Sequence, residues 1–328
     1  MTGDDRLRHA AALLGGRARP AVPLGPLTTY RVGGAAALYV EVDTEADLAA
    51  LRDAVHASQV PVLAVGRGSN LLVADAGFPG LAFRLGGEFD AWRIPAGRST
   101  DPVPATAVPA TAVPGAGGSA TTVTVWAGGA VSLPVLARAT VAHRLTGFEW
   151  AVGVPGSVGG AVRMNAGGHG SDMAASLRGV RVVDLLGGED GEVPARALEL
   201  RYRHSSIAPA HVVVSATLAL APGDREASEA ELGEIVRWRR AHQPGGPNAG
   251  SVFTNPPGDS AGRLIDEAGA KGLRIGTAEV STKHANFIQA DPGGSADDVA
   301  ALMAEVRRRV RDRFGVDLEP ETRMVGFA

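Results

Sequence analysis

The sequence feature that most constrains the fold of this chain is a glycine-dense stretch over residues 147–170. Its eight glycines are Gly147, Gly153, Gly156, Gly159, Gly160, Gly167, Gly168 and Gly170. Glycine weakens helices and strands because it loses the most conformational freedom on folding. Two interpretations fit this spacing equally well. Successive backbone N–H groups in tight turns can form a cradle for a phosphate-bearing ligand, or the stretch can be a run of buried tight turns.

Bulk properties place the chain among globular proteins. With 328 residues it is long enough for two or three domains, and 45% hydrophobic with 20% charged residues is an ordinary balance. A net charge of -3 argues against nucleic acid or an anionic membrane as partner. The absence of cysteine excludes disulfides and iron–sulfur clusters. The acidic start and the lack of a long apolar run predict a cytoplasmic protein without a membrane partner.

Local signals predict both helices and strands along the chain. Capping boxes predict helices that begin at Thr44, Ser228 and Ser295. Further helices are expected over 132–145 and from Ser260, and strands over 37–42, 60–65, 71–73, 178–185 and 211–220. The order of these elements lacks the long βαβ series of a doubly wound sheet, so we predict an α+β fold with more than one sheet. The main domain boundary is expected at Pro222-Gly223.

A second glycine motif, Gly66-Arg67-Gly68, follows the strand predicted over 60–65. It is not a dinucleotide-binding fingerprint, because the third glycine is missing and a strand rather than a helix is predicted next. The sequence predicts instead a strand–turn–strand loop that offers backbone N–H groups and the side chains of Ser69 and Asn70.

Residues 98–118 carry a local repeat, in which Pro104-Ala105-Thr106-Ala107-Val108 recurs at once as Pro109-Ala110-Thr111-Ala112-Val113. The repeat lies between strand candidates at 91–94 and 121–126. We expect a mobile surface loop that extends a hairpin and has no function of its own.

Three polar residues lie in glycine- or proline-flanked segments far apart in the sequence. Ser251 follows Gly250 where a strand is expected to begin, Arg203 follows a tyrosine at the expected end of another strand, and Glu321 follows Pro320. Spacing alone favours simple explanations: a turn hydroxyl, a surface ion pair and a solvated carboxylate. The eight histidines show no metal-ligand spacing, and neither a nucleophile elbow nor a Walker loop is present, so no metal site is predicted.

Several uncommon strings in the same order give the chain a resemblance to the UDP-N-acetylenolpyruvoylglucosamine reductase family over nearly its whole length. They are Tyr30-Arg31-Val32-Gly33-Gly34, Gly66-Arg67-Gly68-Ser69-Asn70-Leu71-Leu72, the stretch from Gly153 to Asn165, Tyr202-Arg203, Asn248-Ala249-Gly250-Ser251 with Asn255-Pro256, Ala261-Gly262-Arg263-Leu264-Ile265-Asp266, and Leu318-Glu319-Pro320-Glu321. The short spacing from Arg203 to Ser251 resembles the compact subtype of this family.

The resemblance implies a two-lobed FAD-binding domain of the vanillyl-alcohol-oxidase (PCMH) type and a C-terminal α+β substrate-binding domain. On this sequence the first lobe covers 1–85 and the second 86–221. The substrate-binding domain covers 222–316, and a tail over 317–328 returns to the active site. We also expect a monomer.

The resemblance further implies NADPH-dependent, FAD-mediated reduction of UDP-N-acetylglucosamine enolpyruvate to UDP-N-acetylmuramate, in peptidoglycan precursor synthesis. FAD is expected to be noncovalent and NADPH to be the reductant. The family's proton donor falls on Ser251, and its two electrostatic partners fall on Arg203 and Glu321. The expected cofactor-binding residues are Arg31, Gly66, Arg67, Gly68, Ser69, Asn70, Leu71, Gly153, Pro155, Gly156, Ser157, Gly159, Gly160 and Asn165. The expected substrate-binding residues are Tyr202, Asn255, Gln243 and His169.

The sequence departs from the family pattern in three places. Thr254 stands where the family often has Lys, Gly168-His169 where it usually has Ala-Tyr, and His204 where it often has Asp. The first change removes a cation expected near the UDP diphosphate, and the second replaces a phenol by an imidazole. Substrate affinity is therefore the property we expect these departures to alter.

Two other interpretations remain. A noncatalytic flavin- or UDP-sugar-binding paralogue would fit the motifs, although the joint retention of Arg203, Ser251 and Glu321 argues against it. An oxidase of the same flavin fold would act on another alcohol and could hold FAD covalently through His169.

Overall fold

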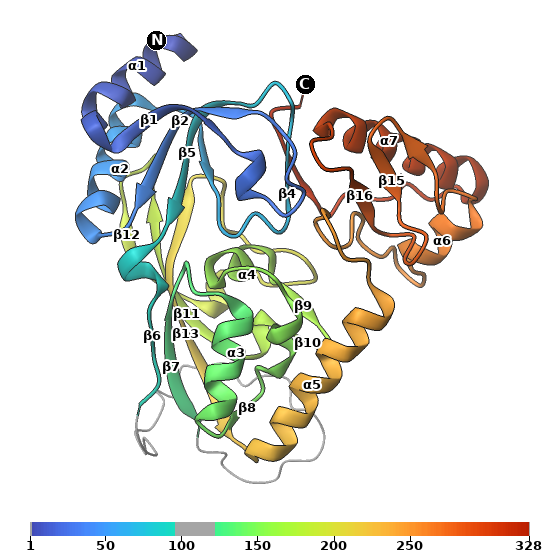
Figure 1. Ribbon diagram of the computed structural model, residues 1–328. Helices are drawn as coiled ribbons and strands as arrows, with labels where there is room; N and C mark the ends of the chain where they lie inside the picture. Colours follow the sequence, from blue (N-terminus) through green and yellow to red (C-terminus); the bar gives the residue numbers. More distant parts are fainter. Residues whose placement is uncertain (1, 96–121, 328) are drawn as a thin grey trace. The chain divides into compact units, whose positions relative to one another are not determined.

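The computed structural model describes residues 2–95 and 122–327 (Figure 1), so the repeat-bearing loop predicted over 98–118 lies outside the described residues. The chain forms two compact units. Unit 1 comprises Met1–Val40, Val60–Phe83 and Trp238–Ala328, and unit 2 comprises Glu41–Gln59 and Arg84–Arg237. Among the described residues, the helices are all too short or too polar to cross a bilayer.

Helices and strands are interspersed through both units. The α-helices are α1 (Gly3–Leu14), α2 (Glu45–Ser58), α3 (Leu133–Ala142), α4 (Val158–Met164), α5 (Arg225–His242), α6 (Ala261–Glu267) and α7 (Ala296–Phe314). The strands are β1 (Ala18–Pro23), β2 (Ala35–Val42), β3 (Val62–Ala64), β4 (Leu71–Val73), β5 (Phe78–Leu85), β6 (Trp92–Arg93), β7 (Val123–Gly128), β8 (Leu145–Thr146), β9 (Gly167–Gly168), β10 (Ser171–Asp172), β11 (Leu177–Asp184), β12 (Asp190–Pro194), β13 (His211–Pro222), β14 (Arg274–Ile275), β15 (Ala278–Val280), β16 (Ile288–Ala290) and β17 (Arg323–Val325).

The N-terminal part of the chain forms a four-stranded sheet with the order β1-β2-β5-β3. In unit 1 the short strand β4 pairs in parallel with β17, which brings the C-terminal tail beside the first part of the chain. A three-stranded sheet, β14-β15-β16, lies with α6 and α7 in the C-terminal part of the same unit. The apolar side chains along one face of α7 are buried, namely Val299, Leu302, Met303, Val306 and Val310.

Tyr30, Val32 and Leu72 belong to the same hydrophobic cluster as α6 and α7. This shared core packs the early loops of the chain together with its C-terminal domain. The loops that carry the predicted site residues of unit 1 therefore rest on a common support.

Unit 2 is built on an antiparallel sheet with the path β12-β11-β13-β7-β6, and β8 also pairs with β13. The strands on either side of residues 96–121 pair as predicted, with Trp92 opposite Ala127 and Arg93 opposite Trp126. The mixture of mainly antiparallel sheets with separate helices confirms the predicted α+β class, and the described residues contain no doubly wound βαβ series.

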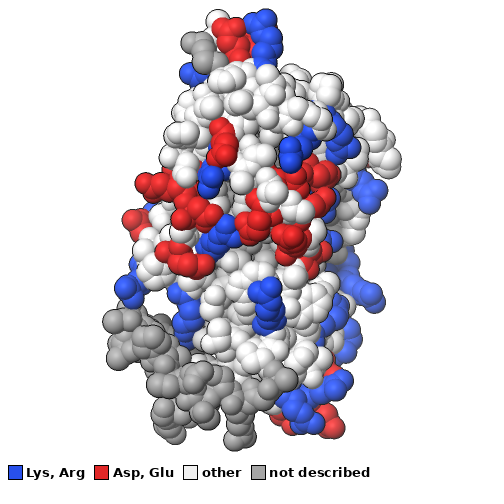
Figure 2. All heavy atoms as spheres, turned by 90° about the vertical axis from the view of Figure 1, so that its left-hand side faces the viewer, with Lys and Arg blue, Asp and Glu red and all other residues white. Residues whose placement is uncertain are grey.

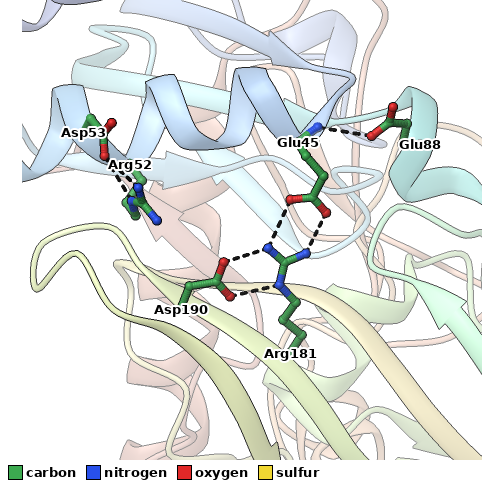
Figure 3. Close-up of polar contacts among 6 residues, drawn as sticks. All are labelled: Glu45, Arg52, Asp53, Glu88, Arg181 and Asp190. Carbon is green, nitrogen blue, oxygen red and sulfur yellow. Dashed lines mark hydrogen bonds and ion pairs between the residues drawn. The ribbon is translucent and has the colours of Figure 1, made fainter.

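An ion-pair network fixes α2 to this sheet (Figure 3). Arg181 on β11 donates to Glu45, the first residue of α2, with Nη1 2.6 Å from Oε1, and to Asp190 on β12, with Nη2 2.6 Å from Oδ2. Hydrogen bonds to Asp190 and Glu45 raise the pKa of Arg181. Basic and acidic side chains are interspersed on the face shown in Figure 2, as is usual for a solvated surface.

One of the three helix starts predicted from capping boxes is wrong. The other two are confirmed, because the hydroxyl of Thr44 accepts from the N–H of Asp47 and that of Ser295 accepts from the N–H of Asp298. The helix expected to begin at Ser228 instead begins at Arg225, because Asp224 accepts from the N–H of Ala227 at 2.8 Å. Ser228 thus lies inside α5 and is buried.

Candidate active site

In unit 1, the loop over residues 66–70 contains one position, Gly68, whose backbone conformation and close packing require glycine. Gly68 has φ of 63°, and a Cβ there would lie 2.1 Å from the carbonyl oxygen of Leu27. The N–H of Thr29 donates to the carbonyl of Gly68 at 3.1 Å, which holds this loop against the segment that carries Arg31. The strand–turn–strand prediction is confirmed, since β3 precedes the loop and β4 follows it.

Asn70 joins this loop to the C-terminal tail. Its Nδ2 donates to the carbonyl of Glu321 at 3.0 Å, and its own carbonyl accepts from the N–H of Arg323 at 2.9 Å. The parallel pairing of β4 with β17 continues this contact. The tail therefore lies directly beside the predicted cofactor loop.

The same tail also lies beside the Ser251 segment. The N–H of Glu321 donates to the carbonyl of Val252 at 2.8 Å, and the N–H of Thr254 donates to the carbonyl of Glu319 at 2.9 Å. Glu321 and Ser251, which are 70 residues apart in the sequence, are thus brought to neighbouring backbone segments. The strand predicted to begin at Ser251 is not formed; the segment is irregular, with a single bridge from Phe253 to Pro320.

Two predicted substrate residues lie in the same unit. Gln243 follows the end of α5, and its Oε1 is buried with no hydrogen-bond partner in the described part of the chain. Buried polar atoms in proteins are normally satisfied, so such an acceptor is suited to an incoming donor. Asn255 is exposed, and its Oδ1 accepts from the N–H of Ala261 at the start of α6. Thr254, the departure from the family pattern, is half-buried.

In unit 2, Asn165 is a hydrogen-bond centre at the end of α4. It is 1% exposed and caps the helix with φ of 39°. Its Nδ2 donates to Asp172 at 2.9 Å and to the carbonyl of Arg201 at 3.1 Å, and its Oδ1 accepts from the N–H of Ala174. The side-chain amide of Asn165 therefore ties the glycine-dense stretch to the segment that carries Arg203.

Arg203 lies in a tight turn rather than at the end of a strand, which corrects the prediction from sequence. The N–H of His204 donates to the carbonyl of Arg201 at 3.0 Å, and that of Arg201 donates back to His204 at 3.2 Å. Arg203 itself has φ of 54°. Tyr202 is 58% exposed, with the Arg203 guanidinium 5.2 Å from the centre of its ring. Ser205 fixes the far side of the turn by donating to the carbonyl of Arg163 at 2.7 Å.

Within the glycine-dense stretch, packing accounts for Gly159. A Cβ at this position would lie 3.0 Å from the carbonyl oxygen of Val213 and 3.2 Å from that of Gly129. Its N–H donates to Gly129, and the N–H of Gly160 donates to the hydroxyl of Ser157. The N–H groups of both glycines bond protein acceptors, and both lie in α4, with Gly159 half-buried and Gly160 exposed, so neither belongs to a buried tight turn.

His169 lies at the tip of the β9–β10 hairpin. His169 and Gly170 have φ of 52° and 83°, and Gly168 pairs with Ser171 across this two-residue turn. This is the backbone of a type I′ hairpin turn. His169 is exposed, and the other predicted residues of the stretch lead into α4: Gly153, Pro155, Gly156 and Ser157.

The residues of unit 1 fit the phosphate part of FAD. Gly66 and Arg67 are exposed, whereas Gly68 is buried and fixes the turn. Arg31 is exposed on the neighbouring segment, which is joined to the loop through Thr29 and Gly68. Exposed backbone together with arginine side chains is the chemistry that binds a diphosphate.

Several residues that organise these sites were not predicted from the sequence. Asn286 binds both backbone groups of Phe253; Asp172 and Ser205 fix the Arg203 turn and its support. For Asn286 a signal was present, because it is a polar residue inserted between Ala285 and the apolar pair Phe287-Ile288. Asp172 and Ser205 carry no comparable signal, because Asp172 follows Gly170-Ser171 and Ser205 lies between His204 and Ser206, so neither stands out from its neighbours.

Comparison with known proteins shows the family. Residues 242–325 match the UDP-N-acetylenolpyruvoylglucosamine reductase C-terminal domain, and residues 116–189 match an FAD binding domain. A UDP-N-acetylenolpyruvoylglucosamine reductase of Heliobacterium modesticaldum is 41% identical, over 93% of this chain and 89% of the relative. The one from Methylorubrum extorquens is 40% identical, over 98% and 96%.

Solved structures agree with this relationship. The crystal structure of the UDP-N-acetylenolpyruvylglucosamine reductase from Thermus caldophilus has a TM-score of 0.75 and 34% identity, covering 94% of this chain and 99% of that one. The predicted fold, a flavin-binding domain followed by a C-terminal α+β domain, is thereby confirmed. The chain belongs to the UDP-N-acetylenolpyruvoylglucosamine reductase family.

Proposed function

We propose that this chain catalyses the NADPH-dependent, FAD-mediated reduction of UDP-N-acetylglucosamine enolpyruvate to UDP-N-acetylmuramate. The observation that carries the proposal is the convergence, in one unit of a chain from this family, of the 66–70 loop, Ser251 and Glu321. The predicted proton donor and the predicted carboxylate thus lie on adjacent segments, beside the loop that fits the phosphates of FAD.

FAD, when bound, supplies the hydride that adds to the terminal carbon of the enolpyruvyl double bond, and NADPH restores that hydride. Negative charge then develops on the neighbouring carbon and on its carboxylate. A proton delivered to that carbon completes a saturated ether carrying a methyl group. The protein therefore has two tasks, which are to stabilise the developing charge and to deliver the proton.

We assign the first task to Arg203. A guanidinium is planar, stays charged and can form two hydrogen bonds with one carboxylate. A fixed cation beside a carboxylate whose charge grows in the transition state lowers the barrier without rearranging. The turn that holds Arg203 is braced by Asn165 and Ser205, and this bracing supports the assignment.

We assign the second task to Ser251. A serine hydroxyl is a weak acid, so delivery of its proton leaves an alkoxide that must be stabilised and reprotonated. Glu321, on the neighbouring segment, is proposed to take part in that relay or to hydrogen-bond the intermediate when protonated. Both roles need Glu321 next to the Ser251 segment, which is where the backbone bond to Val252 holds it.

Binding roles complete the proposal. FAD is held without a covalent bond by the 66–71 loop, Arg31 and the stretch from Gly153 to Asn165. The UDP-sugar contacts Tyr202, Gln243, Asn255 and His169, and the buried Oε1 of Gln243, which lacks a partner in the described part of the chain, supports its assignment. The domain boundaries at 85, 221 and 316, and a cytoplasmic location, remain predictions of the same proposal.

The test separates the two half-reactions. Reduction by NADPH protonates no carbon, so the Ser251→Ala enzyme should bleach its flavin at close to the wild-type rate. Reoxidation by the enolpyruvyl sugar requires the proton and should slow by about 10²-fold or more. Substrate binding should change little, because only a hydroxyl is lost. Rapid-mixing absorbance at the flavin band measures each half separately.

Thr282→Ala is the matched control, since it removes a hydroxyl from an exposed residue of the same unit. It should leave both half-reactions unchanged. Equal slowing of the two halves by Ser251→Ala would mean that Ser251 shapes the pocket or positions the flavin, and would exclude it as proton donor. Wild-type protein that oxidises NADPH without any dependence on the enolpyruvyl sugar would contradict the proposed function itself.

A further inference from the structure

The buried amide of Asn286 holds the segment that carries Ser251. Asn286 is 4% exposed and lies just before β16. Its Oδ1 accepts from the N–H of Phe253 at 3.0 Å, and its Nδ2 donates to the carbonyl of Phe253 at 2.8 Å. Its backbone carbonyl accepts from the N–H of Val252 at 2.9 Å. Three hydrogen bonds from one residue thus fix the two residues that follow Ser251.

These bonds replace the strand partner that the Ser251 segment lacks. The other side of Val252 is bonded to Glu321, whose N–H donates to the Val252 carbonyl. Residues 252 and 253 therefore lie between Asn286 on one side and the tail on the other, and the N–H and carbonyl groups of both residues are all bonded to Asn286 or Glu321. Such bonds set where Ser251 lies relative to Glu321.

Asn286 is itself rigidly held. Its N–H donates to Nδ1 of His284 at 3.2 Å, and the N–H of Phe287 donates to the carbonyl of His284 at 3.0 Å. Ile288, two residues further on, is in register with Val280 in the three-stranded sheet. A reacting group supported by side chains on fixed elements keeps its geometry, whereas displacement by about 1 Å can reduce a rate on the order of 10²-fold.

We propose that Asn286 is a positioning residue that sets Ser251 in register with Glu321 for proton delivery to the substrate. This inference rests on the proposed function of the site. Asn286 acts through Ser251 and needs no contact with substrate or cofactor. Its removal should therefore impair the step that uses the Ser251 proton and no other step.

The first test uses Asn286→Ala. The oxidative half-reaction with the enolpyruvyl sugar should slow by about 10- to 100-fold, on the scale expected of a misplaced group. Reduction of the flavin by NADPH should stay within about twofold of wild type, as should the substrate affinity measured from perturbation of the oxidised flavin spectrum. Asn286→Asp keeps the size of the side chain but puts a carboxylate oxygen, with its negative charge, where Nδ2 donates to the carbonyl of Phe253, so it breaks the same contact and provides the comparison if the alanine variant does not fold.

The second test combines Asn286→Ala with Ser251→Ala. If Asn286 acts only through Ser251, adding Asn286→Ala to the Ser251→Ala enzyme should slow its oxidative half-reaction by less than about twofold. The group that Asn286 positions is already absent from that enzyme. Val306→Ala is the control for general destabilisation. Val306 is buried in the same hydrophobic cluster but lies on α7, and its loss should leave the oxidative half-reaction near the wild-type rate.

The possible results distinguish this inference from the function on which it rests. Suppose that Ser251→Ala slows the oxidative half-reaction and that Asn286→Ala slows the Ser251→Ala enzyme by the same factor as it slows wild type. Asn286 then has only a structural role and the inference is wrong. If Asn286→Ala slows both half-reactions equally, the inference is also wrong. If Ser251→Ala itself has no effect, the proposed proton donor is wrong and the inference is overturned with it.

Discussion

At the scale of single residues, Arg203 combines a functional side chain with a strained backbone. Its φ of 54° lies in the left-handed region, which non-glycine residues adopt at a cost of roughly 1–2 kcal/mol. The position is the third residue of a tight turn, where glycine is usual. Strain of this kind tends to be retained where a side chain is needed for function. The conformation therefore supports the role proposed for the Arg203 guanidinium.

The first prediction compares Arg203→Gly with Arg203→Ala. Both variants lose the guanidinium, so both should lose about 10²-fold or more in the oxidative half-reaction. They should differ in stability, because glycine adopts the left-handed conformation without the Cβ penalty. Glycine also has the larger conformational entropy in the unfolded chain, which offsets part of this advantage. The Arg203→Gly protein should therefore be more stable than the Arg203→Ala protein by roughly 0.5–1 kcal/mol. Urea unfolding of the two variants measures the difference. An alanine variant as stable as the glycine variant would show that the turn carries little strain.

At the scale of elements, α5 is anchored by a buried carboxylate. Glu149, which is 4% exposed, accepts from the hydroxyl of Ser228 at 2.6 Å and from the N–H of Gly147 at 2.7 Å. Desolvation by itself would raise the pKa of Glu149, but these hydrogen bonds, with one from Thr146, lower it overall. The start of the glycine-dense stretch is thereby fixed to α5, a contact that depends on Ser228 lying inside the helix.

The second prediction concerns Ser228→Ala, which should lower the free energy of unfolding by about 1.5–3 kcal/mol at pH 7, the range for a hydrogen bond to a charged group. Because the folded-state pKa of Glu149 is depressed, its contribution is full above the unfolded value of about 4.3 and is lost as pH falls through the folded pKa. The difference between wild type and variant should therefore shrink below about pH 4. Urea unfolding of wild type and variant, followed by tryptophan fluorescence at pH 7 and below about pH 4, measures this difference in the free energy of unfolding.

Ser206→Ala is the matched control for that experiment, since Ser206 is exposed and its hydroxyl donates to the carbonyl of Ala197 at a long 3.3 Å. Its effect should be within about 0.5 kcal/mol at either pH. A Ser228→Ala effect of the same size at low and neutral pH would show that the hydroxyl matters through packing and not through the charge of Glu149.

At the scale of the whole molecule, the third prediction is that the protein is a monomer. The large apolar side chains exposed among the described residues come from separate elements along the chain: Leu13, Trp92, Val135, Leu186, Tyr202, Trp238 and Met324. Single exposed apolar residues are normal on a monomer, whereas a stable dimer needs a contiguous patch. Sedimentation equilibrium at micromolar concentration should give the mass of one chain. A concentration-independent dimer would contradict the prediction.

Much of the architecture could be predicted because it depends on local signals. The strand at 71–73 and the helix starts at Thr44, Ser260 and Ser295 were found, since periodicity and capping are properties of neighbouring residues. The start of α5 was missed because two competing caps, Asp224 and Ser228, are four residues apart and only the fold gives Ser228 a buried partner.

For the site, rare strings in a fixed order identified the family and with it FAD and NADPH, and the same motifs are the basis on which Ser251, Arg203 and Glu321 are predicted as site residues. The tertiary structure decided that Glu321 lies beside Val252, that Arg203 sits in a strained turn, and that Asn165 and Asn286 brace these segments. The physical reason is the distance along the sequence over which each kind of interaction acts. Capping, periodicity and glycine conformation are encoded within a few residues, whereas a hydrogen bond between residues 33 or 251 positions apart exists only after the chain has folded.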